Sequence, residues 1–131
     1  MAALKKYAES APVSVVANFS LGIPVLLELV RRVIPQLPAG WEVEIVEIHH
    51  KHKKDAPSGT AKRLLAATGR PDTPWHSLRM GDVVGEHTVH LAGPGERIEL
   101  KHIATRREVF AIGAVRHARA LVQDEPGLYL R

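Results

Sequence analysis

The chain has 131 residues, of which 45% are hydrophobic and 24% are charged, as expected for one ordinary globular domain. No apolar run approaches the ~20 residues of a membrane span, the first ten residues lack the apolar stretch of a secretory signal, and there is no cysteine. These features exclude integral membrane proteins, disulfide scaffolds and thiol nucleophiles, and we expect a cytoplasmic protein. The net charge of +4 indicates an anionic ligand more readily than a dedicated nucleic-acid surface.

The amino-terminal half predicts a strand, a helix and a second strand after a weakly helical start at residues 2–10. The β-branched run at 13–17 predicts a short buried strand. Apolar residues recur at helical spacing over 21–37, where Pro24 fits only in the first turn and further prolines end the helix. Alternating glutamate and apolar residues at 41–48 predict the next strand.

The middle of the chain predicts a capped helix followed by a loop. Ser58 or Thr60 is a typical N-cap for a helix that runs to about residue 67. Residues 69–77 are rich in proline and are predicted to form a loop.

The carboxy-terminal part predicts a hairpin and a last helix. Strand-like runs at 84–92 and 97–104 are joined by Gly-Pro-Gly-Glu, which is a hairpin signal. Thr105-x-x-Glu108 has the spacing of a capping box and predicts a helix through about residue 122. The element order predicts an α+β fold with a mixed or mainly antiparallel sheet and helices on one face.

Residues 47–60 contain the unusual chemistry of the sequence. A strand ends on His49 and His50, three lysines follow within four positions, and Ser58-Gly59-Thr60 opens a helix. Free N–H groups at a helix N-terminus bind carboxylate or phosphate, lysines add positive charge, and a histidine transfers protons near neutral pH. The segment therefore predicts a site for a small anion that needs one proton transfer. The alternative is a solvated charged loop in which Ser58 only caps the helix.

Three other interpretations are disfavoured. A metal site is not predicted, because His49 and His50 point to opposite faces of a strand and the neighbouring lysines repel a cation. A nucleic-acid surface is disfavoured because aromatic residues make up only 5% of the chain and no recognition motif accompanies the basic charge. The glycines at 93–98 join two strands instead of opening a helix, so they are not a dinucleotide-binding turn.

The segment EIHHKHKKDAPSGTA at 47–61 resembles the signature of the 4-hydroxy-tetrahydrodipicolinate (dihydrodipicolinate) reductase family, E-x-H-H-x-x-K-x-D-A-P-S-G-T-A, at every fixed position. Further family blocks are ANFSLG at 17–22, GEHTV at 85–89, AGPGERIEL at 92–100, REVFA at 107–111 and GAVR at 113–116. Pro24 stands where the family has asparagine, so we expect a local difference at that helix start. No Gly-x-x-Gly-x-x-Gly turn is present, so the Rossmann domain of the family has no counterpart in these residues.

The resemblance implies that residues 1–131 are the carboxy-terminal substrate-binding and oligomerisation domain of the family, which forms a homotetramer. The implied reaction is the reduction of a cyclic imine dicarboxylate by NADH or NADPH on the diaminopimelate route to lysine. His49 is implied as the proton donor or acceptor and Lys53 as the second acid. The residues implied to hold the substrate carboxylates are His50, Ser58, Gly59 and Thr60. Those implied to lie along the nicotinamide are Val16, Ala17, Asn18 and Phe19, although Asn18 as a helix cap and Phe19 as a core residue are open alternatives.

Two functions remain open after the resemblance. The first is the catalytic half of the reductase, which we expect to be inactive and not to bind NADH or NADPH without a dinucleotide domain. The second is a non-catalytic oligomerisation or anion-binding module derived from that half, which the absence of a cofactor turn favours. Arg116 is interpreted either as a surface residue or as a cofactor contact.

Overall fold

The computed structural model describes residues 1–130, which fall into two compact units. Unit 1 combines Met1–Ser20 with the segment from Glu108 onward, and unit 2 is Leu21–Arg107. No helix in the described part of the chain is long and apolar enough to cross a membrane.

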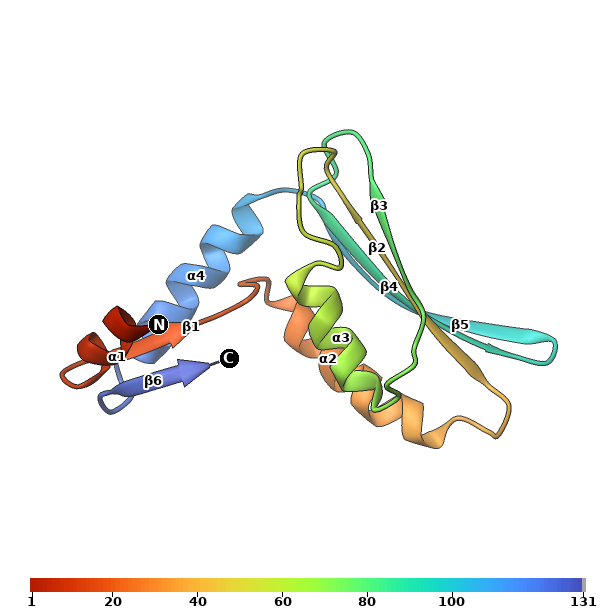
Figure 1. The fold of residues 1–131 in the computed structure, drawn as a ribbon, viewed down its shortest axis with the longest axis horizontal. Coiled ribbons are helices and arrows are strands. Elements are labelled where there is room, and N and C mark those ends of the chain that lie inside the picture. Colours follow the sequence, from red (N-terminus) through yellow and green to blue (C-terminus); the bar gives the residue numbers. More distant parts are fainter. Residues whose placement is uncertain (131) are drawn as a thin grey trace. The chain divides into compact units, whose positions relative to one another are not determined.

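Unit 2 is a four-stranded sheet with two helices on one of its faces (Figure 1). Its elements are α2 (Gly22–Val33), η1 (Ile34–Gln36), β2 (Glu42–His49), α3 (Gly59–Thr68), β3 (Trp75–Arg79), β4 (Gly85–Gly93) and β5 (Glu96–Ala104). The strand order is β3-β2-β4-β5, in which β3 runs parallel to β2 while the other neighbours are antiparallel. The predicted α+β class, with a mixed sheet and helices on one face, is confirmed.

The core of unit 2 lies between the sheet and the helices α2 and α3. Side chains of β2 alternate between its two faces, so Val43 and Ile45 point inward together with Glu47 and His49. The apolar part of this inner face packs in one cluster of buried residues, which contains Ile23, Leu26, Leu27, Val30, Ile34, Val43, Ile45, Leu64, Val89 and Leu91. Each such side chain contributes roughly 1.5–3 kcal/mol when fully buried. The same face changes from apolar to ionisable at Glu47, and there the candidate site begins.

Local signals set several element boundaries correctly. Ser58 is the N-cap of α3, and its hydroxyl accepts the N–H of Ala61 at 3.1 Å. The predicted hairpin joins β4 to β5 with Gly93 opposite Glu96. Its two loop residues are Pro94 and Gly95, and Gly95 has a φ of 80°, which suits glycine. Pro24 lies in the first turn of α2, as predicted.

Strand β3 corrects the prediction of a loop over residues 69–77. Its five residues pair in parallel with β2, with Ser77 opposite Glu47 and Arg79 opposite His49. The strand lies at the edge of the sheet, and these two inward side chains face the polar end of β2 instead of the apolar core. The apolar alternation that identifies a strand is therefore absent from its sequence.

The described residues of unit 1 form two helices and a two-stranded parallel sheet. Its elements are α1 (Ala2–Ala8), β1 (Pro12–Val15), α4 (Glu108–Leu121) and β6 (Gly127–Leu130). Helix α4 begins at Glu108, slightly later than a cap at Thr105 predicts, because a turn separates it from β5. Strand β6 was not predicted, since its partner β1 lies more than a hundred residues away in the sequence.

Candidate functional site

The buried carboxylate of Glu47 is the centre of the polar end of the sheet. Its side chain is 1% exposed, and Arg79 donates from Nη2 to Oε1 at 2.6 Å and from Nη1 to Oε2 at 2.9 Å. Ser77 donates its hydroxyl to Oε1 at 2.5 Å, and the Ser58 N–H donates to the same oxygen at 3.2 Å. Burial raises the pKa of Glu47, but hydrogen bonds from Arg79, Ser77 and His49 outweigh it and lower this pKa to about 2. Glu47 is therefore ionised at neutral pH.

His49 ends β2 on the same face as Glu47, and its Nδ1 is hydrogen-bonded to Glu47 Oε2. Because a carboxylate only accepts, Nδ1 carries the proton and Nε2 is the nitrogen left for a reactant. Burial lowers the pKa of His49, and the hydrogen bond to Glu47 opposes this effect. Gly85 lies beside the ring, where a Cβ would stand 3.1 Å from Nε2. Glycine at this position therefore leaves space next to the reactive nitrogen.

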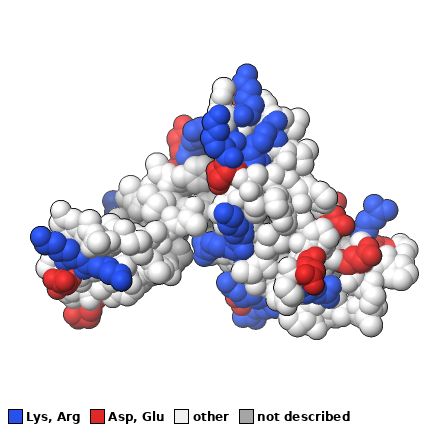
Figure 2. Space-filling model, viewed as in Figure 1, with Lys and Arg blue, Asp and Glu red and all other residues white. Residues whose placement is uncertain are grey.

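The loop after β2 is folded back on itself and tied to β3. The Lys53 N–H donates to the His50 carbonyl at 3.1 Å, and Lys53 Nζ lies 2.8 Å from Asp55 Oδ1. The hydrogen bond from Lys53 lowers the pKa of Asp55. Arg79 Nη2 donates to the Asp55 carbonyl at 2.7 Å. Figure 2 shows Lys and Arg side chains gathered at the end of unit 2 where this loop lies, which gives the site a positive rim.

The first turn of α3 brings the predicted anion-binding residues to this end of the sheet. Ser58 is 2% exposed, and its hydroxyl contacts both the Ala61 N–H and His87 Nε2, the latter at 3.0 Å. Thr60 is also buried, whereas Gly59 is exposed at the helix N-terminus. Gly59 is thus the most exposed of the three, and the substrate contacts of Ser58 and Thr60 stay predictions.

Sequence reasoning assigned no role to Glu47, Ser77, Arg79 or His87. The sequence contained a signal for Glu47, because residues i and i+2 of a strand share a face and Glu47 therefore lies on the same side as His49. Ser77 and Arg79 carried none, since Ser77 ends the segment predicted as a loop and Arg79 lies between that segment and the next predicted strand. His87 is 2% exposed, and its ring makes an edge contact with His49 at 5.1 Å between centroids. Burial lowers the pKa of His87 to about 3, so it is a neutral ring at physiological pH.

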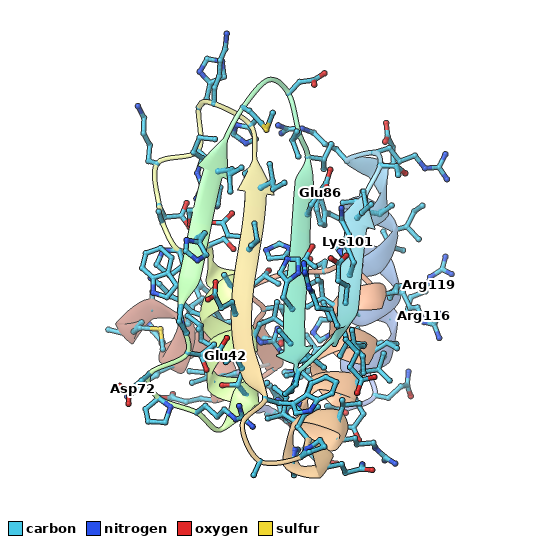
Figure 3. All side chains as sticks on the ribbon, turned by 90° about the vertical axis from the view of Figure 1, so that its right-hand side faces the viewer. Glu42, Asp72, Glu86, Lys101, Arg116 and Arg119 are labelled. Atoms are coloured by element: carbon cyan, nitrogen blue, oxygen red, sulfur yellow. The ribbon has the colours of Figure 1, made fainter. Side chains whose placement is uncertain are left out.

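The residues predicted to lie along a nicotinamide belong to unit 1. Val16, Ala17, Asn18 and Phe19 directly follow β1. The Ser20 N–H donates to Asn18 Oδ1 at 2.8 Å, so Asn18 stabilises a local turn, and the N-cap position of α2 is Leu21. The ring of Phe19 makes an edge contact with His117 of α4. Arg116 is exposed on the same helix (Figure 3).

Comparison with known proteins gives consistent matches. The family model for the C-terminus of dihydrodipicolinate reductase matches residues 22–130. The 4-hydroxy-tetrahydrodipicolinate reductase of Xanthomonas euvesicatoria pv. vesicatoria (strain 85-10) is 52% identical over 130 residues, which are 98% of this chain and 54% of that protein. The enzyme of the same name from Stenotrophomonas maltophilia (strain R551-3) is 54% identical over 129 residues, which are 97% of this chain and 54% of that protein.

A solved structure shares the fold. Dipicolinate-bound dihydrodipicolinate reductase from Paenisporosarcina sp. TG-14 superposes with a TM-score of 0.70 at 22% identity, and the match covers 95% of this chain and 54% of that chain. The chain thus spans about half the length of the curated relatives it matches. With a family model covering residues 22–130, the chain belongs to the dihydrodipicolinate reductase family, of which it represents the C-terminal domain.

Proposed function

We propose that this chain is the substrate-binding and catalytic half of a 4-hydroxy-tetrahydrodipicolinate reductase, which acts with NADH or NADPH in the biosynthesis of lysine through diaminopimelate. The observation that carries the proposal is His49, held by an ionised carboxylate beside the N-terminus of α3 and next to a lysine-rich loop. A small dicarboxylate is the substrate class that such a positive, hydrogen-bonding end of a sheet attracts. The related Paenisporosarcina structure contains dipicolinate, which supports this class.

The residues take different roles in this proposal. His49 transfers a proton through Nε2, and Lys53 is the second acid. His50, Gly59 and Thr60, with Ser58 as the helix cap, hold the carboxylates at the positive end of the α3 dipole. Stabilising charge that develops in the transition state is the largest contribution that such fixed donors make to a rate.

The nicotinamide cofactor supplies the hydride when it is bound. The segment of Val16, Ala17, Asn18 and Phe19, in which Ala17 is exposed and the other three are half-buried, follows a strand end and fits a role beside the flat ring. The chain has no glycine-rich turn that could hold the pyrophosphate, so the proposal requires a dinucleotide-binding domain in the active enzyme. We also propose that the enzyme acts in the cytoplasm, as predicted from the sequence.

A chimaera tests the proposal: this chain replaces the matching half of the Xanthomonas euvesicatoria reductase, and NADH or NADPH oxidation is followed with the dicarboxylate substrate. We expect an active enzyme in which His49→Ala and Lys53→Ala lower kcat by about 10²–10⁴-fold. Thr60→Val removes a contact to a carboxylate and is expected mainly to raise KM.

Lys54→Ala is the matched control, because Lys54 is an exposed neighbour of Lys53 in the same loop. We expect it to leave kcat nearly unchanged, while circular dichroism shows that all four variants are folded. If His49→Ala and Lys53→Ala stay within about threefold of the parent kcat, far below the usual effect of losing a proton-transfer group, the assigned roles are wrong.

We further propose that the chain forms a homo-oligomer, with the tetramer of the family as its assembly. Two features support this proposal. Strand β5 is an edge strand of nine residues, and among the described residues of unit 2 no helix covers the outer face of the sheet (Figure 3). These features also favour the alternative of a non-catalytic assembly module, which an inactive but oligomeric chimaera would support.

A further inference from the structure

One carboxylate connects the two parts of the candidate site. Glu47 Oε2 is hydrogen-bonded to His49 Nδ1, and Glu47 Oε1 accepts the N–H of Ser58, the N-cap of α3. We propose that Glu47, held in place by Arg79, is a positioning residue that sets the tautomer and orientation of His49 and fixes the ring relative to the first turn of α3. This inference rests on the proposed function, since it concerns the same proton transfer.

Glu47 is rigid because both of its oxygens are fully engaged. The Arg79 guanidinium binds them as a fork, and Ser77 adds a third donor. Arg79 is itself fixed, since Nη1 donates to the Leu78 carbonyl and Nη2 to the Asp55 carbonyl, each within 2.8 Å. A carboxylate that is 1% exposed is stable only with such partners. The parallel pairing of β3 with β2 places Ser77 and Arg79 beside Glu47.

The tautomer of His49 depends on this carboxylate. The groups that face or influence the ring are Glu47 on β2, Arg79 on β3, His87 on β4 and Lys53 in the loop, and Glu47 is the anion among them. A free neutral imidazole prefers the proton on Nε2, whereas an acceptor at Nδ1 draws the proton there. With Glu47 in place, Nε2 is left bare when the ring is neutral, and it carries a proton toward the reactant when the ring is charged.

The hydrogen bond from the Ser58 N–H also ties the Glu47 carboxylate to the start of α3. Ser58 caps α3, so its N–H marks the start of the helix whose N-terminus is proposed to bind the substrate. Glu47 therefore connects the proton-transfer group and the anion-binding group through one rigid side chain. Catalysis requires the reacting groups to be held in place, and a shift of about 1 Å can cost roughly 10²-fold in rate.

The tautomer is measured directly on this chain by ¹⁵N NMR of its histidine rings, with no need for activity. We expect His49 of the parent to carry its proton on Nδ1 at neutral pH, and Glu47→Gln to move it toward Nε2. Glu44→Gln is the matched control, because Glu44 is on the same strand and bonds His76 at 3.0 Å, but on the outer face. It is expected to leave the His49 signals unchanged. An unchanged His49 tautomer in a folded Glu47→Gln chain overturns the inference.

Activity is then measured in the chimaera. Glu47→Gln is expected to lower kcat at least about tenfold, since a histidine in the wrong tautomer loses up to ~10⁴-fold in rate. Arg79→Lys keeps the charge but loses the fork, and it is expected to mix the two tautomers and to lower kcat less. Arg79→Lys also provides a second test if the Glu47→Gln chain does not fold. An unchanged His49 tautomer in Arg79→Lys would then contradict the inference. An inactive parent chimaera would contradict the proposed function but not the inference about Glu47, which the NMR measurement decides separately.

Discussion

His87 shows how a single buried residue sets a pH dependence. Its ring lies on the inner face of β4 between Glu47 of β2 and His102 of β5. Ser58 contacts its Nε2, while Nδ1 is buried without a hydrogen-bond partner among the described residues. Burial is the main reason why its pKa falls from 6.5 to about 3. The folded chain therefore holds His87 neutral at pH values where the unfolded chain protonates it.

We predict that the free energy of unfolding falls as the pH decreases from about 6.5 toward 3. Between these values the unfolded state binds one more proton at this position. The contribution of His87 to the free energy of unfolding is therefore fully present above pH 6.5 and is lost progressively below it. One group of this kind contributes a slope of up to about 1.4 kcal/mol per pH unit. Urea denaturation between pH 7 and 5 measures the slope, which His87→Gln is expected to reduce.

The control for this prediction is His76→Gln, which removes an exposed histidine from the outer face of the sheet. We expect its slope to match that of the parent. His49 also has a lowered pKa and contributes in the same direction, so the slope of His87→Gln does not fall to zero. Equal slopes for the parent and His87→Gln would show that His87 is not the buried neutral group.

Helix α4 shows how packing overrides the intrinsic preference of an element. Gly113 is buried within this helix, and a Cβ there would collide with the backbone carbonyl oxygen of Phe19. Glycine inside a helix usually costs about 0.5–1 kcal/mol relative to alanine. The close approach of the segment after β1 explains why glycine stands at this position.

We therefore predict that Gly113→Ala destabilises the chain by about 1–3 kcal/mol, the range for overpacked sites. Ala111→Gly, at an exposed position of the same helix, is the control and is expected to lose about 1 kcal/mol through helix propensity alone. If helix propensity alone mattered, Gly113→Ala would raise the free energy of unfolding and Ala111→Gly would lower it. With the packing against Phe19, both changes are expected to lower it. A gain in stability for Gly113→Ala, measured by urea denaturation, would show that Phe19 does not limit this position.

On the scale of the whole molecule, the outer face of the four-stranded sheet is the surface that we propose for assembly. Its apolar residues are Val46, Ile48, Leu78 and Ile103, and Leu78 and Ile103 are 41% and 48% exposed. Charged pairs flank them, including Lys101 and Glu86, which lie 3.1 Å apart on neighbouring strands (Figure 3). A face with an apolar centre and charges of both signs can pair with a second copy of itself.

We predict that light scattering shows an oligomer for the parent chain and a smaller species for Leu78→Lys and Ile103→Lys. A lysine on this face would place a charge in the centre of the proposed contact. Val25→Lys is the control, because Val25 is also an exposed apolar residue but lies on α2. A monomeric parent, or dissociation caused equally by Val25→Lys, would argue against this face as the interface.

The sequence by itself determined the features that depend on neighbouring residues. The α+β class, the cap at Ser58 and the Pro-Gly hairpin follow from local periodicity and turn chemistry. His49, Lys53 and the start of α3 were predicted as a site because they lie within one continuous stretch of the chain. The family was also indicated by that stretch, since its fixed positions all fall within fifteen residues.

Only the tertiary structure decided which distant residues complete the site. Arg79 lies 32 residues from Glu47 in the sequence and Ser77 lies 30 away, yet both donate to its carboxylate. His87 reaches Ser58 across 29 residues. Strand order and register place these groups together, and both depend on how the core packs as a whole. Local patterns carry no information about such pairings, so the role of Glu47 emerged only once β3 was placed beside β2.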